Sequence, residues 1–109
     1  MSDFVRVCGT DDVSPGAALA VEVQDTPLAI VHSDGEYFAI YDECSHAEVP
    51  LSEGDIEDTT LECWLHGSRF DLRTGKPTGP PASVPVPVYP VRVEDGDVLV
   101  DVDNPVNES

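Results

Sequence analysis

Two short pairs of cysteine and histidine constrain this chain more than any other feature of its sequence. Cys44 and His46 form the first pair, Cys63 and His66 form the second, and residues 47–62 lie between them. Thiolate and imidazole are good ligands for soft and borderline metals, and the chain has only three cysteines and three histidines. The two pairs therefore predict one metal centre to which two separate loops contribute ligands.

The composition of the pairs bears on the kind of metal centre. Two cysteines and two histidines can hold one tetrahedral zinc ion, but zinc fingers usually pair Cys with Cys and His with His. Here each pair is mixed. Mixed pairs suit a dinuclear iron cluster in which one iron takes both cysteines and the other takes both histidines. A structural zinc module stays open as the alternative.

The residues around the pairs resemble those of the Rieske family of iron–sulfur proteins. Residues 44–46 read Cys-Ser-His and are followed by Leu51 and Gly54, and residues 63–71 read Cys-Trp-Leu-His-Gly-Ser-Arg-Phe-Asp. This pattern is similar to that of the small Rieske ferredoxins that serve bacterial ring-hydroxylating dioxygenases. The resemblance implies one [2Fe–2S] cluster per chain. It also implies the ligands, which are Cys44 and Cys63 on the inner iron and His46 and His66 on the outer iron.

The same resemblance implies that four further residues surround the cluster, namely Gly67, Ser68, Phe70 and Pro80. Respiratory Rieske proteins carry an additional cysteine in each loop, joined as a disulfide, and here those positions hold Val49 and Leu65. Ser68 matches a serine whose hydroxyl bonds a cluster sulfur, whereas Phe70 replaces a tyrosine with a similar role. The pattern therefore predicts a reduction potential at the low end of the Rieske range, about −150 to 0 mV.

The length of 109 residues allows one domain. We predict a single domain over residues 1–103, with a cluster-binding subdomain at about 43–78 and a polar C-terminal tail at 104–109. No apolar run approaches the ~18 residues that a membrane span needs, and the N-terminus lacks the features of a signal peptide, so we expect a cytoplasmic protein. In that compartment an odd cysteine count argues against disulfides, and Cys8 is predicted to be an ordinary buried thiol.

The formal net charge is −17, from 22 acidic residues and 5 basic ones. Such a charge repels nucleic acid and anionic membranes and keeps the chain soluble. It also suits steering toward basic surfaces of a partner, and the sequence leaves both interpretations open. Arg69, Arg73 and Lys76 lie close together in the sequence. We predict that they are counterions to the acidic residues of 42–62 rather than partner contacts.

Short β-branched or alternating segments, separated by turn signals, cover most of the chain. The expected strands are residues 4–8, 17–23, 28–32, 36–41, 59–64, 91–94 and 98–102, with hairpin turns at Asp34-Gly35 and Asp95-Gly96. Prolines make residues 79–90 extended and edge-like, and His32 is expected to be exposed and structural. Because no long segment has helical periodicity, we predict an all-β, antiparallel sandwich or barrel that carries the two cluster-binding loops.

The resemblance implies an electron carrier rather than an enzyme. We expect electrons to pass from a flavin-containing, NAD(P)H-dependent reductase to a terminal non-heme iron oxygenase of an aromatic-ring dioxygenase, through transient electrostatic contacts. The chain is too short for an additional flavin, nicotinamide or catalytic iron site, so no catalytic residues are predicted. The alternatives are a small Rieske subunit of a nitrite-reductase-like enzyme and a Rieske protein associated with iron–sulfur assembly.

Overall fold

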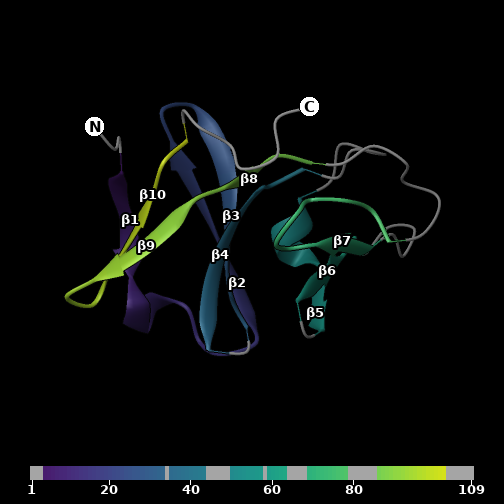
Figure 1. Ribbon diagram of the computed structural model, residues 1–109, viewed down its shortest axis with the longest axis horizontal. Helices are drawn as coiled ribbons and strands as arrows, with labels where there is room; N and C mark the ends of the chain where they lie inside the picture. Colours follow the sequence, from purple (N-terminus) through teal and green to yellow (C-terminus); the bar gives the residue numbers. More distant parts are fainter. Residues whose placement is uncertain are drawn as a thin grey trace.

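The described residues form three antiparallel sheets that follow one another along the longest axis of the molecule (Figure 1). The structure is a computed structural model, and it describes residues 4–33, 35–43, 50–57, 59–63, 69–78 and 86–102. Two short 3-10 helices, η1 (Thr10–Asp12) and η2 (Leu51–Glu53), are the only helices in those ranges. None of the described helices is long and apolar enough to cross a membrane.

Each sheet is built from strands that are paired only in the antiparallel sense. The first sheet has the order β1 (Val5–Gly9), β10 (Asp97–Val100) and β9 (Val91–Glu94). The second sheet, in the middle of the molecule, has the order β2 (Ala17–Val23), β3 (Thr26–Ser33), β4 (Glu36–Tyr41) and β8 (Val88–Tyr89). The third and smallest sheet has the order β5 (Asp55–Glu57), β6 (Thr60–Glu62) and β7 (Arg69–Asp71).

The turn between β2 and β3 explains why β3 begins earlier than the sequence indicated. Gln24 and Asp25 have φ values of 50° and 66°, and two consecutive positive values are typical of a tight two-residue hairpin turn. The pairing therefore continues to Thr26 opposite Val23, and Pro27 belongs to β3 rather than to the turn.

Most other strands confirm the expectation to within two residues at their ends. The predicted turn at Asp95-Gly96 is also confirmed, because both residues have positive φ values, 49° and 81°. β8 lies at the edge of the second sheet, as the proline-rich sequence before it indicated. β7 was not expected, because three residues are too few to show a period of two. Asp34 of the other predicted turn lies outside the described residues.

Strand β3 of the middle sheet is buried on both faces because it lies between two hydrophobic cores. Leu28 and Ile30 of β3 belong to the core shared with the first sheet. Ala29 and Val31 belong to the core shared with the third sheet. Alternate residues of a strand point to opposite faces, so a strand covered on both sides needs the continuous apolar run that residues 28–31 provide.

Two predictions outside the ligand loops have different outcomes. Cys8 is a buried thiol with 5% exposure, as predicted, and burial raises the pKa of this thiol. The prediction that His32 is exposed is wrong. Its ring is half-buried, stacks on Tyr37 with 4.1 Å between ring centroids, and has its Nδ1 3.0 Å from the carbonyl oxygen of Val13. These contacts confirm the predicted structural role of His32, and they account for its partial burial.

Candidate metal centre

Two of the predicted site residues lie in the part of the chain that the structure describes, Cys63 and Phe70. The other predicted ligands and neighbours lie outside it, and they are Cys44, His46, His66, Gly67, Ser68 and Pro80. No three His, Cys, Asp or Glu side chains gather as metal ligands within the described ranges. Cys63, Phe70 and the ends of the two loops are therefore the parts of the centre that the structure describes.

Cys63 comes directly after β6 and has 0% exposure. Leu61, two residues earlier, is equally buried, whereas Glu62 between them is only half-buried. This alternation is that of a strand with one face toward the core. Strand β6 thus carries the thiol of Cys63 into the core shared by the second and third sheets, and this cysteine is not part of a disulfide.

Phe70 lies on the neighbouring strand in the same core. It pairs with Leu61 in the antiparallel register of β6 and β7 and has 0% exposure. Its ring and the thiol of Cys63 belong to the same hydrophobic cluster. Phenylalanine offers no hydrogen-bond donor there, which agrees with the expected loss of the tyrosine hydroxyl at this position.

Side-chain contacts join the two ends of each predicted ligand loop. At the second loop, Glu62 and Arg69 are directly opposite each other in the β6–β7 pairing, and Arg69 Nη2 lies 3.4 Å from Glu62 Oε2. At the first loop, the Asp42 carboxylate accepts hydrogen bonds from the backbone N–H and the hydroxyl of Ser52. Sequence reasoning missed Asp42 and Ser52, because a contact between residues so far apart leaves no local pattern.

The three clustered basic residues differ in their contacts. Arg69 is a counterion to acidic residues of 42–62, as predicted, because it pairs with both Glu62 and Glu57. Arg73 is also a counterion, but it pairs with Glu36 of β4, outside the predicted stretch. Lys76 is exposed and has no ion pair within the described residues, so its counterion role stays a prediction.

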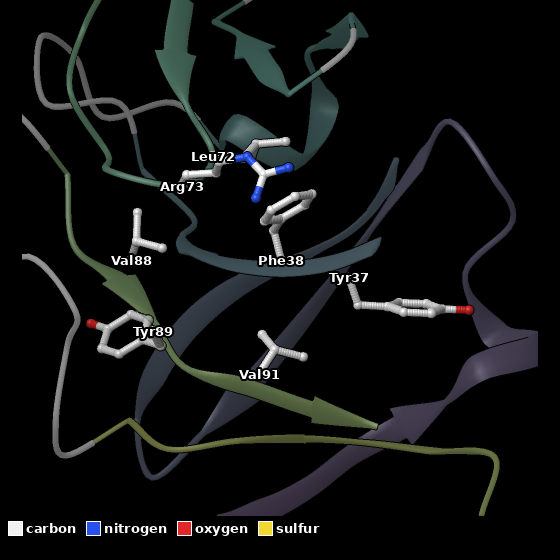
Figure 2. A pocket seen from close by; sticks show the side chains of 7 residues that line it. All are labelled: Tyr37, Phe38, Leu72, Arg73, Val88, Tyr89 and Val91. Atoms are coloured by element: carbon white, nitrogen blue, oxygen red, sulfur yellow. The ribbon is translucent and has the colours of Figure 1, made fainter. Parts of the chain in front are cut away.

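A shallow groove of about 220 Å³ lies where β4, β8 and β9 meet the turn after β7 (Figure 2). The Arg73 guanidinium lies over the Phe38 ring, 5.4 Å from its centroid, and so covers part of this apolar surface. Burial raises the pKa of the Tyr89 hydroxyl on the opposite side of the groove. Cys63, the one predicted ligand that the structure describes, does not line the groove. The groove belongs to the junction between the first two sheets, called the base below, and the third sheet.

The donor set of the four predicted ligands fits a [2Fe–2S] cluster. Two thiols and two imidazoles are the ligands that this cluster takes when histidines replace two of four cysteines. The described member of the set, Cys63, is a buried thiol that no disulfide occupies. A buried, unpaired cysteine at the end of a strand is consistent with a ligand delivered by a rigid element.

Comparisons with known proteins identify the family. Residues 3–90 match the family described as Rieske [2Fe-2S] domain. The chain is 46% identical over 99 residues to the biphenyl dioxygenase ferredoxin subunit of Pseudomonas sp. (strain KKS102), covering 90% of this chain and 91% of that protein. This chain therefore belongs to the Rieske [2Fe–2S] family, with one cluster. It is of the ferredoxin type, an electron-transfer component rather than a catalytic enzyme.

Solved structures agree with this assignment. The ferredoxin of carbazole 1,9a-dioxygenase from Nocardioides aromaticivorans IC177 has a TM-score of 0.85 and 38% identity, covering 89% of this chain and 95% of that one. A chain from the complex of reduced oxygenase and oxidized ferredoxin in carbazole 1,9a-dioxygenase has a TM-score of 0.84 and 34% identity. The match covers 93% of this chain and 94% of that one. The predicted all-β Rieske fold and the predicted family are confirmed, and the zinc alternative is not supported.

Proposed function

We propose that this protein carries single electrons from a flavin-containing, NAD(P)H-dependent reductase to the terminal non-heme iron oxygenase of an aromatic-ring dioxygenase. The observation that carries the proposal is the likeness to dioxygenase ferredoxins over about nine-tenths of both chains, which includes a ferredoxin solved together with its oxygenase. The relatives reported above favour this function over a nitrite-reductase subunit or a protein of iron–sulfur assembly. We also propose that it works in the cytoplasm.

The proposed ligands are Cys44 and Cys63 for the inner iron and His46 and His66 for the outer iron. The cluster, when bound, stores one electron. The role of the protein chain is to hold the ligands on two loops and to exclude water from the inner side of the centre. The full burial of Cys63 supports this role. Gly67, Ser68, Phe70 and Pro80 are proposed to surround the cluster.

The proposed domain organisation follows the sheets. Residues 1–103 are proposed to form one domain, with the cluster-binding subdomain at about 43–78 and a tail at 104–109. The third sheet supports this division, because its strands lie entirely within 43–78 and its core side chains pack on the second sheet.

The charge distribution supports transient electrostatic contact with basic partners. All four arginines are in ion pairs, with Asp97, Glu62, Glu36 and Glu94 as partners. Their charges are therefore compensated locally, and Lys76 is the one basic residue without an ion pair in the described ranges. The excess of acidic side chains then dominates the potential around the molecule, and a field of one sign accelerates encounters with surfaces of the opposite sign.

Reduction by the reductase of a dioxygenase system should slow steeply with salt. Between ~0.01 M and ~1 M ionic strength the Debye length falls from about 30 Å to about 3 Å, so we expect the bimolecular rate constant to fall by roughly tenfold or more. Stopped-flow absorbance measures this rate. A reductase that transfers no electron to the protein at any salt concentration would refute the proposed function.

Two double variants that change the net charge equally test which part of the surface meets the reductase. Glu53 and Asp55 are exposed near the start of β5, and their joint replacement by Gln and Asn should slow reduction at low salt. Asp11 of η1 and Asp95 of the turn between β9 and β10 are exposed beside the first sheet, which lies at the other end of the molecule from β5 (Figure 1). Replacing both by Asn changes the net charge equally. Equal slowing in both variants would mean that only net charge matters. An unchanged rate in both would assign the acidity to solubility.

Phe70→Tyr should raise the midpoint potential of the protein. The new hydroxyl would offer a hydrogen bond beside Cys63, in whose core the ring lies, and such a bond stabilises the more negative, reduced state. Hydrogen bonds to charged groups contribute ~1.5–3 kcal/mol. If about 1 kcal/mol of this distinguishes the two redox states, the potential rises by roughly 40 mV. A redox titration against wild type measures the shift, and a lowered or unchanged potential would show that the ring does not face the cluster.

A further inference from the structure

A side-chain clamp joins the two ends of the first ligand loop. Residues 44–49 connect Glu43 to Pro50, and across this opening Asp42 binds Ser52. Asp42 Oδ1 accepts from the Ser52 backbone N–H at 2.6 Å, and Oδ2 accepts from the Ser52 hydroxyl at 2.8 Å. Hydrogen bonds to an ionised acceptor are shorter and stronger than neutral ones. We refer to these two bonds as the Asp42–Ser52 clamp.

Asp42 is itself fixed to the base of the molecule. Its backbone N–H donates to the carbonyl oxygen of Pro27 at 3.0 Å, and the preceding Tyr41 N–H donates to that of Pro87 at 2.9 Å. Ser52 belongs to η2, whose Leu51 is fully buried in the core that also contains Cys63. The clamp therefore ties a rigid point of the second sheet to the segment that packs beside the metal centre.

Contacts continue from η2 to the second ligand loop. Gly54 ends η2, and a Cβ built on it would lie 1.7 Å from the carbonyl oxygen of Glu62, so the two backbones are in close contact. Glu62 in turn pairs with Arg69 across the base of the second loop. Both loop cysteines are proposed ligands, so no disulfide is left to brace the loops. Non-covalent contacts must do so, and they begin at the clamp.

We propose that the Asp42–Ser52 clamp is a positioning device that holds the two ends of the first ligand loop together and slows the loss of iron from the metal centre. The inference rests on the proposed ligand roles of Cys44 and His46. Asp42 and Ser52 would bind no iron themselves. They would act by keeping together the two ends of the loop that carries two of the four proposed ligands, since a broken ligand bond re-forms faster when the ends of its loop cannot separate.

The rate of iron release to excess chelator, followed by absorbance on the intact holoprotein, tests the proposal. Asp42→Ala removes both bonds and should release iron about tenfold faster than wild type. Ser52→Ala keeps the bond from its backbone N–H and should have a smaller effect. Asp42→Asn keeps one oxygen acceptor and should partly restore the slow rate. Because the two residues act as one unit, the double alanine variant should be no faster than Asp42→Ala.

Asp12→Ala is the matched control. Asp12 belongs to η1, directly after β1 of the first sheet, and its Oδ2 accepts a backbone N–H bond from Gly9 at 2.8 Å. This variant should release iron at the wild-type rate, and only Asp42→Ala should change the electron paramagnetic resonance spectrum of the reduced protein. Wild-type protein without iron would refute the proposed metal site itself. A full iron complement with equal release rates in wild type and Asp42→Ala, or equal acceleration by Asp12→Ala, would overturn the clamp alone.

Discussion

Protein carrying Cys63→Ala is expected to be colourless and to contain no iron above background. Cys63 is the proposed ligand that β6 carries into the core, and alanine cannot bind iron. The three remaining ligands would leave the inner iron with one cysteine, and the cluster should not assemble. Iron and acid-labile sulfide analysis of the purified protein measures the loss, and the visible absorption spectrum provides an independent check.

Cys8→Ala is the matched control, because the chain offers a second buried cysteine in the other core. The same change there should leave the iron content at the wild-type value and lower the free energy of unfolding by about 1 kcal/mol, the effect of losing one small apolar group. A Cys63→Ala protein that keeps its full iron content would refute the ligand role. Loss of iron from both variants would point to general instability of the apoprotein.

Gly54→Ala is expected to destabilise the protein by about 3 kcal/mol or more, at the upper end of overpacking effects. The φ of Gly54 is −87°, so alanine could adopt its backbone conformation. The difficulty is steric, because the new Cβ would lie 1.7 Å from the carbonyl oxygen of Glu62. That carbonyl belongs to β6, so the clash must move either η2 or the strand that leads to Cys63. Chemical denaturation of the variant measures the loss.

Gly9→Ala provides the comparison for this effect. Gly9 also has a negative φ, −92°, and the nearest atom to its added Cβ would be Asp12 Oδ2 at 3.3 Å, at the end of a flexible side chain. We expect its free energy of unfolding to stay within about 0.5 kcal/mol of wild type. Similar stability of both variants would show that η2 can move away from β6 at little cost.

The strands could be predicted from the sequence because their signals are local. The apolar run at residues 28–31 predicts a strand buried on both faces, and Asp95-Gly96 predicts a hairpin. Most strands of the first and second sheets could therefore be predicted. The metal centre also has a local signal, because the residue types and spacing of the two Cys/His pairs are characteristic of one kind of cluster. The family assignment confirms that cluster, and the four ligands stay a prediction.

The remaining features depend on contacts between distant segments. The half-buried ring of His32 lies against the carbonyl oxygen of Val13, nineteen residues earlier, and the pairing of Arg73 with Glu36 joins the turn after β7 to β4. Neither the steric need for Gly54 nor the bond between Asp42 and Ser52 has a sequence pattern. Such contacts depend on how the sheets pack against each other, and the spacing of residues within a short segment does not indicate them.

The two-sided burial of β3 limits how Rieske ferredoxins can be recombined. A chimera that takes only the proposed metal-binding segment, about 43–78, from a relative would place foreign side chains against Ala29 and Val31 of β3 and against Phe38 and Ile40 of β4, which pack with the third sheet. Protein interiors tolerate little change in volume. A working chimera should therefore exchange the metal-binding segment together with the side chains of β3 and β4 that pack on it. The side chains on the opposite face of β3 should remain those of the recipient protein.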